Sequence, residues 1–475
     1  MPDRRLSCLL AMFAFVVAIQ RGTDPVFAAE GHAPNVIVFL ADDLGWGDLA
    51  CYGNDVIQTP HLDEFATEGV RFTQCYSACG VCSPSRSAIL TGRTPFRNGV
   101  YRWVPELPKE GSHVYLRTSE ITIPELLKER GYETCHVGKW HLNGDFNSPH
   151  QPQPDAHGYD HWFATQNNAA PSHKNPVNFV RNGEEVGPLE GFSAPLVVDE
   201  GIRWLKQERS ADKPFFMTVW THEPHLPIES DPQYMALYAD LPIGFRQHHG
   251  NVTQLDAAFG TLMAALDEMQ LTDETFVFFT SDNGPEGDGH GDPKNPGSQR
   301  DRTRGSTGGL RGRKRADFEG GIRVPGIARW PGHIQPGTKS KVPVIGSDIF
   351  STVCDIVDIP LPSDRRIDGA SMLPAFEGKP VERTVPLYWR THLAPKDNRV
   401  AVRVDEWKIV ADETLTKFLL FNIEVDPEET TDLATAHPNV FRRMKNTLLA
   451  VDQQVLNEGP DWWKQDSDSG VSQVK

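Results

Sequence analysis

The hydrophobic pattern of the chain consists of short continuous apolar runs, each followed by a polar loop and then by a helical pattern. The runs occupy residues 36–41, 134–137, 215–220 and 276–279. Continuous apolar runs of this length are typical of strands buried on both faces, as in a parallel sheet, because half-exposed antiparallel strands alternate polar and apolar residues. The pattern therefore predicts a large, mostly parallel sheet.

Helical patterns lie between these runs. Residues 59–69 begin with Thr-Pro and end at a glycine, as helices commonly do. Leu62, Phe65 and Ala66 share one face of this helix, and a second apolar stripe recurs at helical spacing over residues 255–266. Strands that alternate with helices predict an α/β fold in which helices cover both faces of the sheet.

The character of the chain changes near residue 380, and 475 residues exceed what one core usually organises. A long surface loop is expected at residues 287–315, which are rich in Gly, Pro, Asp and Arg. We divide residues 33–460 into an α/β domain, residues 33–378, which includes this loop, and an α+β subdomain, residues 379–460. The subdomain is predicted to hold a small antiparallel sheet and a closing helix, at residues 387–389, 401–404, 407–410, 418–422 and 441–455.

The N-terminus, residues 1–28, has the composition of a secretory signal peptide. Arg4 and Arg5 precede an apolar stretch, and small residues then offer a cleavage site. A retained anchor is the alternative, but the stretch is shorter than the roughly 20 residues that cross a bilayer. Cys8 lies before the stretch, whereas a lipid-bearing cysteine would follow it. We expect export to the periplasm or the medium, with no membrane span after cleavage.

Charge and cysteine content narrow the classes of partner. The formal charge is −17, and it becomes −18 when residues 1–28 take three arginines and two aspartates with them. An acidic chain disfavours nucleic acid as a partner, and an anionic ligand would need a local cationic patch. Of seven cysteines, Cys8 leaves with residues 1–28, and five remain besides Cys82, so at least one of the five stays unpaired. Export permits disulfides among them, but the sequence does not give their pairing.

Polar residues follow each apolar run directly, at the edge where parallel sheets bind ligands. Asp42 and Asp43 follow the first run, and Asp282 and Asn283 follow the fourth. If these two strands are neighbours, the four side chains meet and offer oxygen ligands that favour calcium or magnesium over zinc. Solvated turns or helix caps are the alternative. Two such pairs, each directly after a buried type of run, favour the metal site.

Candidate cations and bases follow the other runs. Lys139 and His141 follow the second run, and His222 and His225 follow the third. A cationic patch is predicted from seven basic residues, Arg300, Arg302, Arg304, Arg311, Arg313, Lys314 and Arg315. Asn251 heads a glycosylation sequon, but it also opens a helix pattern, so a capping role is favoured.

One cysteine segment is the most specific motif in the chain. Residues 82–93 read Cys-Ser-Pro-Ser-Arg-Ser-Ala-Ile-Leu-Thr-Gly-Arg and resemble the signature of the type I sulfatases. Roughly residues 34–435 resemble this family, with matching segments at 35–47, 138–141, 222–227, 281–284 and 310–331. The resemblance implies the alkaline phosphatase-like fold, the hydrolysis of sulfate esters, and a similarity to arylsulfatases and N-acetylgalactosamine-6-sulfatases.

The resemblance also implies how the nucleophile is made and held. Cys82 would be oxidised to formylglycine (3-oxoalanine) by a formylglycine-generating enzyme, and its hydrate would attack sulfur. Arg86 would hold a hydroxyl of that hydrate. One Ca²⁺ per chain would bind modified Cys82 together with Asp42, Asp43, Asp282 and Asn283.

The remaining roles carry over residue by residue. Lys139 would contact the sulfate, and His141 would be the base for sulfate release. His225 would lie near the leaving-group oxygen, and Lys314 would neutralise the sulfate and help protonate the leaving group. The chain has Arg-Lys-Arg at 313–315 where the family commonly has Gly-Lys-Gly, so the sequence alone does not settle which cation fills this role. For His222, supporting another residue and contacting substrate remain equal alternatives.

Three alternatives remain at this stage. The pair Cys79 and Cys82 has the spacing of a redox protein. A phosphatase or phosphonate hydrolase of the same superfamily would share the fold and the position of the nucleophile. A chain that is never modified would bind sulfated polysaccharide without hydrolysing it. We favour a hydrolase of sulfated carbohydrate.

Overall fold

The computed structural model describes residues 33–105, 113–287 and 300–460. The predicted signal peptide, residues 1–28, lies outside these ranges, as does part of the predicted loop 287–315. Within the described ranges, none of the helices combines the length and the apolar character needed to cross a bilayer.

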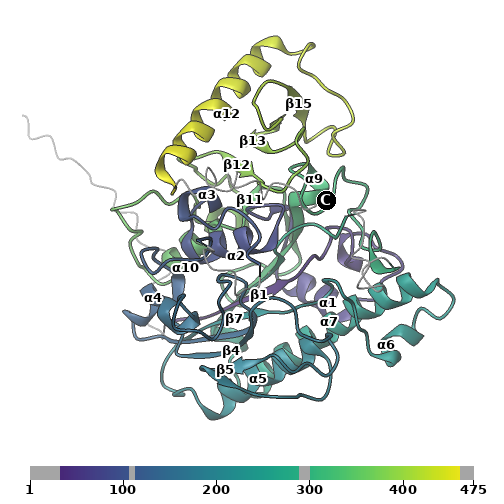
Figure 1. Ribbon diagram of the computed structural model, residues 1–475, viewed down its shortest axis with the longest axis vertical. Coiled ribbons are helices and arrows are strands. Elements are labelled where there is room, and N and C mark those ends of the chain that lie inside the picture. The colour runs from purple at the N-terminus through teal and green to yellow at the C-terminus, as the bar shows by residue number, and fades with distance from the viewer. Residues whose placement is uncertain (1–32, 106–112, 288–299, 461–475) are drawn as a thin grey trace, which may run out of the picture. The chain divides into compact units, whose positions relative to one another are not determined.

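The larger of the two described sheets is a mixed sheet at the centre of the fold (Figure 1). It contains eleven strands in the described ranges: β1 (Asn35–Ala41), β2 (Val70–Tyr76), β3 (Glu133–Lys139), β4 (His161–Thr165), β5 (Val180–Arg181), β6 (Glu184–Glu185), β7 (Phe215–Trp220), β8 (Thr275–Ser281), β9 (Arg323–Arg329), β10 (Thr338–Ser340) and β11 (Val344–Ile345). Their order is β10-β2-β9-β8-β1-β7-β3-β4-β5-β6, and β11 pairs with β2.

The four apolar runs form the centre of this sheet. They are β8, β1, β7 and β3, which lie next to one another and are all parallel. In the register of β1 and β8, Ala41 lies opposite Ser281. The prediction of neighbouring parallel strands is confirmed, and the segments that begin at Asp42 and Asp282 leave the sheet side by side.

Helices cover both faces of the sheet, as predicted. Their bounds are α1 (Pro60–Glu68), α2 (Cys82–Thr91), α3 (Pro95–Asn98), α4 (Ile123–Lys128), α5 (Ser193–Gln207), α6 (Pro232–Ala236), α7 (Ile243–Glu268), α9 (Glu319–Ile322), α10 (Asp348–Ile356) and α11 (Leu373–Phe376), with single turns η1 (Ala50–Tyr52), η2 (Pro154–His157) and η3 (Thr272–Glu274). Ile37 and Phe39 of β1 share a core with α1, α5 and α7. Val38 and Leu40 share another with α2, α4 and α10. Burial on both faces explains why the run has no polar alternation.

A second, smaller sheet follows, as the change of character near residue 380 predicts. It is antiparallel and has four strands within the described ranges, in the order β12 (Leu387–Arg390), β13 (Val400–Val404), β14 (Trp407–Ala411) and β15 (Phe418–Asn422). The closing helix α12 (Pro438–Glu458) packs on β13 and β14, at the yellow end of the chain in Figure 1.

The sequon prediction was wrong. Helix α7 begins at Ile243, so Asn251 lies in its third turn and is fully buried, where it neither caps the helix nor meets solvent. Its Nδ2 donates to the backbone carbonyl of Glu229 (3.2 Å). The first two turns of α7 bury Gln247, His248 and other polar residues, so no apolar stripe marks where the helix starts.

Buried charges connect the small sheet to the large one. Lys408 of β14 forms ion pairs with Glu319 of α9 (2.9 Å) and with Glu429 (3.0 Å), and all three side chains are inaccessible to solvent. Two carboxylates therefore share one ammonium group in the interior, where an unpaired charge is very costly.

Replacing Lys408 with methionine is expected to lower the free energy of unfolding by about 3–5 kcal/mol, because Glu319 and Glu429 lose their shared cation. Urea unfolding followed by circular dichroism measures this change. Lys339→Met, at an exposed position of β10, is the matched control and should stay within about 0.5 kcal/mol of the parent. Equal stability of the two variants would contradict a stabilising role for the ion pairs of Lys408.

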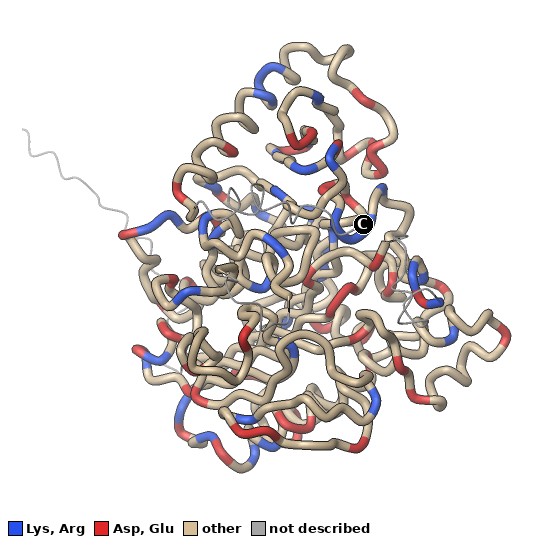
Figure 2. Tube along the Cα trace, in the orientation of Figure 1, with Lys and Arg blue, Asp and Glu red and all other residues tan. Residues whose placement is uncertain are grey.

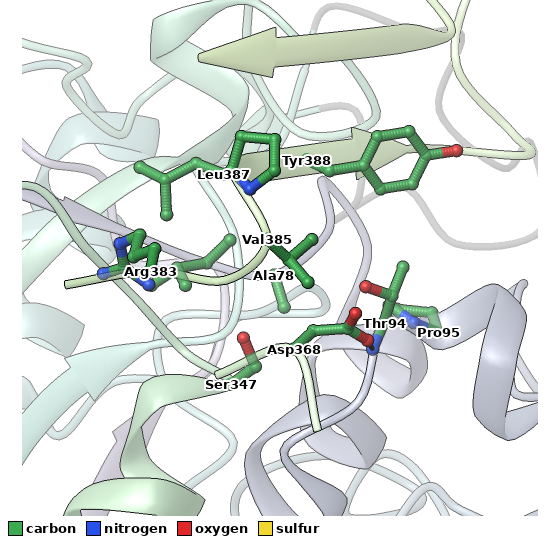
Figure 3. Close-up of a pocket in the computed structure, with 11 residues that line it drawn as sticks. Ala78, Thr94, Pro95, Ser347, Asp368, Arg383, Val385, Leu387 and Tyr388 are labelled. Atoms are coloured by element: carbon green, nitrogen blue, oxygen red, sulfur yellow. Dashed lines mark hydrogen bonds between the residues drawn. The ribbon is translucent and has the colours of Figure 1, made fainter. Parts of the chain in front are cut away.

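A pocket lies where β12 meets the segment between α2 and α3 (Figure 3). Asp368, in its lining, accepts hydrogen bonds from the backbone N–H of Thr94 (2.7 Å) and from Arg97 Nε (3.0 Å). None of the predicted site residues is among the described residues that line this pocket. The predicted chemistry therefore belongs elsewhere.

Candidate active site

The predicted site residues meet at one edge of the large sheet. Asp42 and Asp43 follow β1, Asp282 and Asn283 follow β8, and Lys139 ends β3. The strand β2 leads to the cysteine helix α2 and runs parallel to β8, because both are antiparallel to β9. All of these strands therefore end at the same edge, as the ligand rule for such sheets requires.

Glycine allows Lys139 to reach this edge. Gly138 has φ +109°, and a Cβ there would lie 1.9 Å from the backbone oxygen of Trp220 on the neighbouring strand. Only a residue without a side chain fits between β3 and β7 at this point.

Cys82 is the first residue of α2 and is 1% exposed. The backbone of Gly80, two residues earlier, is held on both sides: its N–H donates to Thr391 Oγ1 (3.3 Å), and its carbonyl accepts from the N–H of Arg315 (2.7 Å). The small C-terminal sheet thus helps to fix the start of α2, since Thr391 directly follows β12. Burial raises the pKa of the Cys82 thiol, and Lys139 and Lys314 oppose this rise.

The other half of the proposed redox pair is bonded elsewhere. Cys79 Sγ lies 3.4 Å from Thr391 Oγ1. Among residues 33–105, 113–287 and 300–460, all six cysteines are free thiols.

Three carboxylates of the site face three cations. Asp42 Oδ2 accepts from Lys139 Nζ (2.6 Å), and Asp43 Oδ1 lies 2.6 Å from Lys314 Nζ. Asp282 Oδ2 accepts from Arg86 Nη2 (2.7 Å). Arg86 also donates to the backbone carbonyl of Lys139 (3.0 Å). Among these six charged groups the three positive charges balance the three negative ones.

The carboxylates differ in how readily they ionise. Burial would raise the pKa of Asp42, but Lys139, His225 and Arg86 hold it well below its usual range. Burial and the neighbouring charge of Asp42 raise the pKa of Asp282 to about 7, although Arg86 opposes this. The neighbouring carboxylates Asp42 and Asp282 therefore have pKa values shifted in opposite directions.

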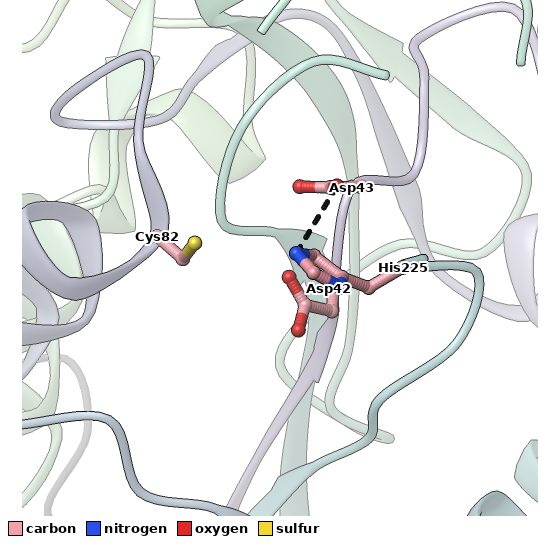
Figure 4. Close-up of side chains that lie close together, drawn as sticks. All are labelled: Asp42, Asp43, Cys82 and His225. Carbon is pink, nitrogen blue, oxygen red and sulfur yellow. Dashed lines mark ion pairs between the residues drawn. The ribbon is translucent and has the colours of Figure 1, made fainter. Parts of the chain in front are cut away.

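The oxygen donors fit a hard divalent cation. Asp42 Oδ1 and Asn283 Oδ1 are buried and accept no hydrogen bond from any described residue. Asp42, Asp43, Cys82 and His225 each present one ligand atom, all within 4.8 Å of one another, and Figure 4 shows Cys82 facing Asp42. Asp282, a predicted ligand, is not part of this group; it accepts hydrogen bonds from Arg86 and from the N–H of Asp43 (3.2 Å). Carboxylate and amide oxygens are the donors that Ca²⁺ prefers.

A hydrogen bond to a backbone carbonyl fixes the tautomer of His141. Its Nε2 lies 3.0 Å from the backbone carbonyl of Val104, which can only accept, so Nε2 carries the proton. Its Nδ1 is buried and has no partner among the described residues. Burial and Lys139 lower the pKa of His141 well below its ordinary value, so the ring is neutral and Nδ1 is a free base.

A backbone carbonyl also fixes the tautomer of His225, here through the other ring nitrogen. Its Nδ1 donates to the backbone carbonyl of Leu226 (2.5 Å), which leaves Nε2 facing Asp43 Oδ2 at 3.7 Å. Burial and the positive charge of Lys314 lower the pKa of His225 to about 4.

His222 lies deeper than His225. It is fully buried, and its Nε2 lies 2.8 Å from Thr165 Oγ1. The hydroxyl of Thr165 donates to the backbone carbonyl of Asn167 (2.7 Å), so the imidazole must donate to Thr165.

Among the three basic residues at 313–315, Lys314 is the one that pairs with an aspartate of the site. Arg313 donates to the backbone carbonyl of Glu286 (2.9 Å), and Arg315 pairs with the carboxylate of Glu286 (2.6 Å). Lys314 is buried on Asp43. Burial would lower the pKa of Lys314, but Asp43 raises it above its ordinary value.

The predicted cationic patch is largely neutralised within the protein. Arg302 and Arg315 both pair with Glu286, and Arg300 pairs with Asp301. Along the chain, Figure 2 shows acidic and basic positions interleaved. Four of the seven basic residues of the predicted patch therefore already pair with a carboxylate of the protein: Arg300, Arg302, Lys314 and Arg315.

Sequence reasoning missed two groups. Glu286 holds three cations of the patch, and burial would raise its pKa, but Lys314 and Arg315 hold it well below its usual range. Its place four residues after Asp282 was the available signal. The backbone carbonyl of Val104, which fixes the tautomer of His141, has no sequence signal, because any residue supplies a carbonyl.

Comparisons with known proteins identify the relatives of this chain. The Sulfatase family model matches residues 34–359, and the model for the C-terminal region of N-sulphoglucosamine sulphohydrolase matches residues 312–454. N-acetylgalactosamine-6-sulfatase from Canis lupus familiaris is 34% identical over 413 residues, covering 80% of this chain and 72% of that protein. N-acetylgalactosamine-6-O-sulfatase from Bacteroides thetaiotaomicron is 29% identical, covering 94% and 98%. The crystal structure of Ps i-CgsB in complex with k-i-k-neocarrahexaose is similar at a TM-score of 0.78 and 25% identity, covering 90% and 94%.

Proposed function

We propose that this chain, which belongs to the sulfatase family and is a hydrolase of sulfuric esters, releases sulfate from a sulfated carbohydrate. Its nucleophile would be Cys82 oxidised to formylglycine, and its cofactor one Ca²⁺. The observation that carries the proposal is the meeting of Cys82 with Asp42, Asp43 and His225 within 4.8 Å at the edge of the sheet.

Charge balance supports the calcium ion. Asp42, Asp43 and Asp282 already match Arg86, Lys139 and Lys314 in number. An anionic sulfate ester adds negative charge to a buried site, and a divalent cation on the side chains of Asp42, Asp43, Asp282 and Asn283, with modified Cys82, would compensate for it. When bound, the ion would supply Lewis-acid stabilisation of the sulfate oxygens.

The nucleophile must attack sulfur and later release the sulfate that becomes bound to it. The hydrated aldehyde of oxidised Cys82 would supply one hydroxyl that attacks sulfur and a second whose deprotonation releases sulfate. A plain serine or cysteine has no second hydroxyl and would remain esterified. Arg86, next to this position and fully buried, would hold one of the hydroxyls.

His141 is suited to the release step. Its neutral ring carries a proton on Nε2 and a free lone pair on the buried Nδ1, so it would take the proton whose removal expels sulfate. Lys139, two residues earlier and paired with Asp42, would contact the sulfate oxygens as a point charge.

Lys314 and His225 are suited to the leaving group. Lys314 keeps its proton at neutral pH, because Asp43 raises its pKa, and would neutralise the sulfate and help protonate the departing oxygen. His225 Nε2 faces the same carboxylate and would lie beside that oxygen. His222, which donates to Thr165, would hold the backbone segment that carries His225 in place.

A sulfated galactose or N-acetylgalactosamine unit is the substrate class we propose. The two curated relatives described above bear the name of N-acetylgalactosamine 6-sulfatases. The structural neighbour holds a neocarrahexaose, which is also a carbohydrate. Maturation by a formylglycine-generating enzyme and export from the cytoplasm are parts of the same proposal.

Sulfate release from defined sugars tests the proposal. We expect N-acetylgalactosamine 6-sulfate or galactose 6-sulfate to give kcat/KM at least about tenfold above 4-nitrophenyl sulfate, because sugar contacts add binding energy in the transition state. Ion chromatography of released sulfate measures this. Efficient turnover of only small aryl sulfates would contradict the carbohydrate assignment, and efficient turnover of phosphate or phosphonate esters would favour the superfamily alternative.

A further inference from the structure

One aromatic side chain stands out at the rim of the site. Among the described residues, Trp103 is the only aromatic member of the set of large hydrophobic side chains that are exposed, with 38% of its surface accessible. Its ring centroid lies 6.4 Å from that of His141, in an edge arrangement of 78°. His141 itself is fully buried, whereas Trp103, in contact with it, keeps part of its own surface open to solvent.

The backbone next to Trp103 is fixed to the active-site elements. The N–H of Val104 donates to Ser83 Oγ (3.2 Å), one residue from Cys82, and the carbonyl of Val104 accepts from His141 Nε2 (3.0 Å). On the other side, the Tyr101 ring contacts the ring of His392 at 5.3 Å. An indole anchored in this way loses little freedom when a ligand binds, which makes it an efficient contact.

The exposed part of the indole leaves flat apolar surface available for contact with a ligand. The other large aromatic side chains near the base are buried: Trp140, Trp220 and Tyr159 have at most 1% of their surface accessible. Trp103 is the exception: it is exposed, and its ring contacts the ring of His141.

We propose that Trp103 is a specificity-determining residue that binds the apolar face of the sugar ring bearing the sulfate. This inference rests on the proposed function. A galacto-configured pyranose has C3–H, C4–H and C5–H on one face, and such a face packs on an aromatic ring while the hydroxyls stay hydrated. The buried charges of the site would bind the sulfate group of any sulfate ester equally well. Contact with the indole would then favour sulfated sugars over other sulfate esters.

The test uses binding, so that it does not depend on oxidation of Cys82. In a Cys82→Ala background, calorimetric titration compares Trp103→Ala, Trp103→Phe and the unchanged tryptophan. The probes are N-acetylgalactosamine 6-sulfate and inorganic sulfate, which has no apolar face. Val425→Ala, at a site of 78% exposure beyond β15, is the control for loss of an exposed apolar side chain.

We expect Trp103→Ala to weaken binding of N-acetylgalactosamine 6-sulfate about tenfold, Trp103→Phe to retain most of the affinity, and inorganic sulfate to bind all variants equally. Unchanged affinity for the sugar in Trp103→Ala would overturn the inference. Equal weakening for both probes would also overturn it, since Trp103 would then act on the shape of the sulfate site. If neither probe binds the parent Cys82→Ala protein, the proposed function fails and the inference falls with it.

Discussion

Replacing Cys82 with alanine is expected to lower kcat/KM for a sulfate ester roughly 10⁴-fold or more, because the group that attacks sulfur is lost while the charges that bind sulfate remain. Sulfate release by the purified variant measures the loss. The same loss is expected for the unaltered chain produced without a formylglycine-generating enzyme, and co-production with that enzyme should restore activity.

Cys79→Ala is the matched control for this experiment. Cys79 Sγ contacts Thr391 Oγ1 and the backbone carbonyl of Arg390, so its removal should keep activity within about tenfold of the parent. Mass spectrometry of the peptide that contains Cys82 identifies its state directly. An aldehyde supports hydrolysis, and an intact thiol in an active enzyme would contradict the proposed nucleophile. A disulfide with Cys79, lost together with activity in either variant, would favour the redox alternative.

Replacing Asp282 with alanine is expected to abolish calcium binding and to lower kcat roughly 10³-fold or more. Asp282 is one of three clustered carboxylates, and its Oδ2 also accepts two hydrogen bonds from Arg86, so both the proposed ion and the proposed holder of the nucleophile lose their partner. Calcium content is measured by atomic emission spectroscopy and turnover by sulfate release. Chelation of the parent enzyme should give the same loss, and added Ca²⁺ should reverse it.

Asp256→Asn is the control for loss of a buried carboxylate. Asp256 is 1% exposed and accepts from the backbone N–H groups of His61 and Leu62, at the contact of α1 with α7. This variant should retain one Ca²⁺ and most of its turnover. Full activity of Asp282→Ala, or of the parent enzyme after chelation, would contradict the metal assignment.

The sequence predicted the centre of the sheet because its signal is local. Residues of β1, β7 and β8 are buried on both faces, and burial on both faces leaves no alternation of polar and apolar residues. The strands β2 and β9, which lie between β10 and β8 in the sheet, carry no such run, since polar residues interrupt β2 and arginines and a proline interrupt β9, and these strands were not predicted. The start of α7 was misplaced for a similar reason: its first turns bury polar side chains.

Much of the candidate site was also within reach of the sequence. Residue types and their place after each buried run brought Asp42, Asp282, Lys139 and His225 into consideration, and the motif around Cys82 pointed to the sulfatase family. These features are properties of short segments. A short segment keeps its chemistry whatever the rest of the chain does.

The tertiary structure alone decided which groups pair and which atoms stay free. Lys314 reaches Asp43 across 271 residues of chain, while Arg313 and Arg315, its direct neighbours, turn to Glu286. The free Nδ1 of His141 depends on a backbone carbonyl 37 residues away. Hydrogen bonds and ion pairs act over a few ångströms, so they are set by the folded path of the chain and not by spacing along it.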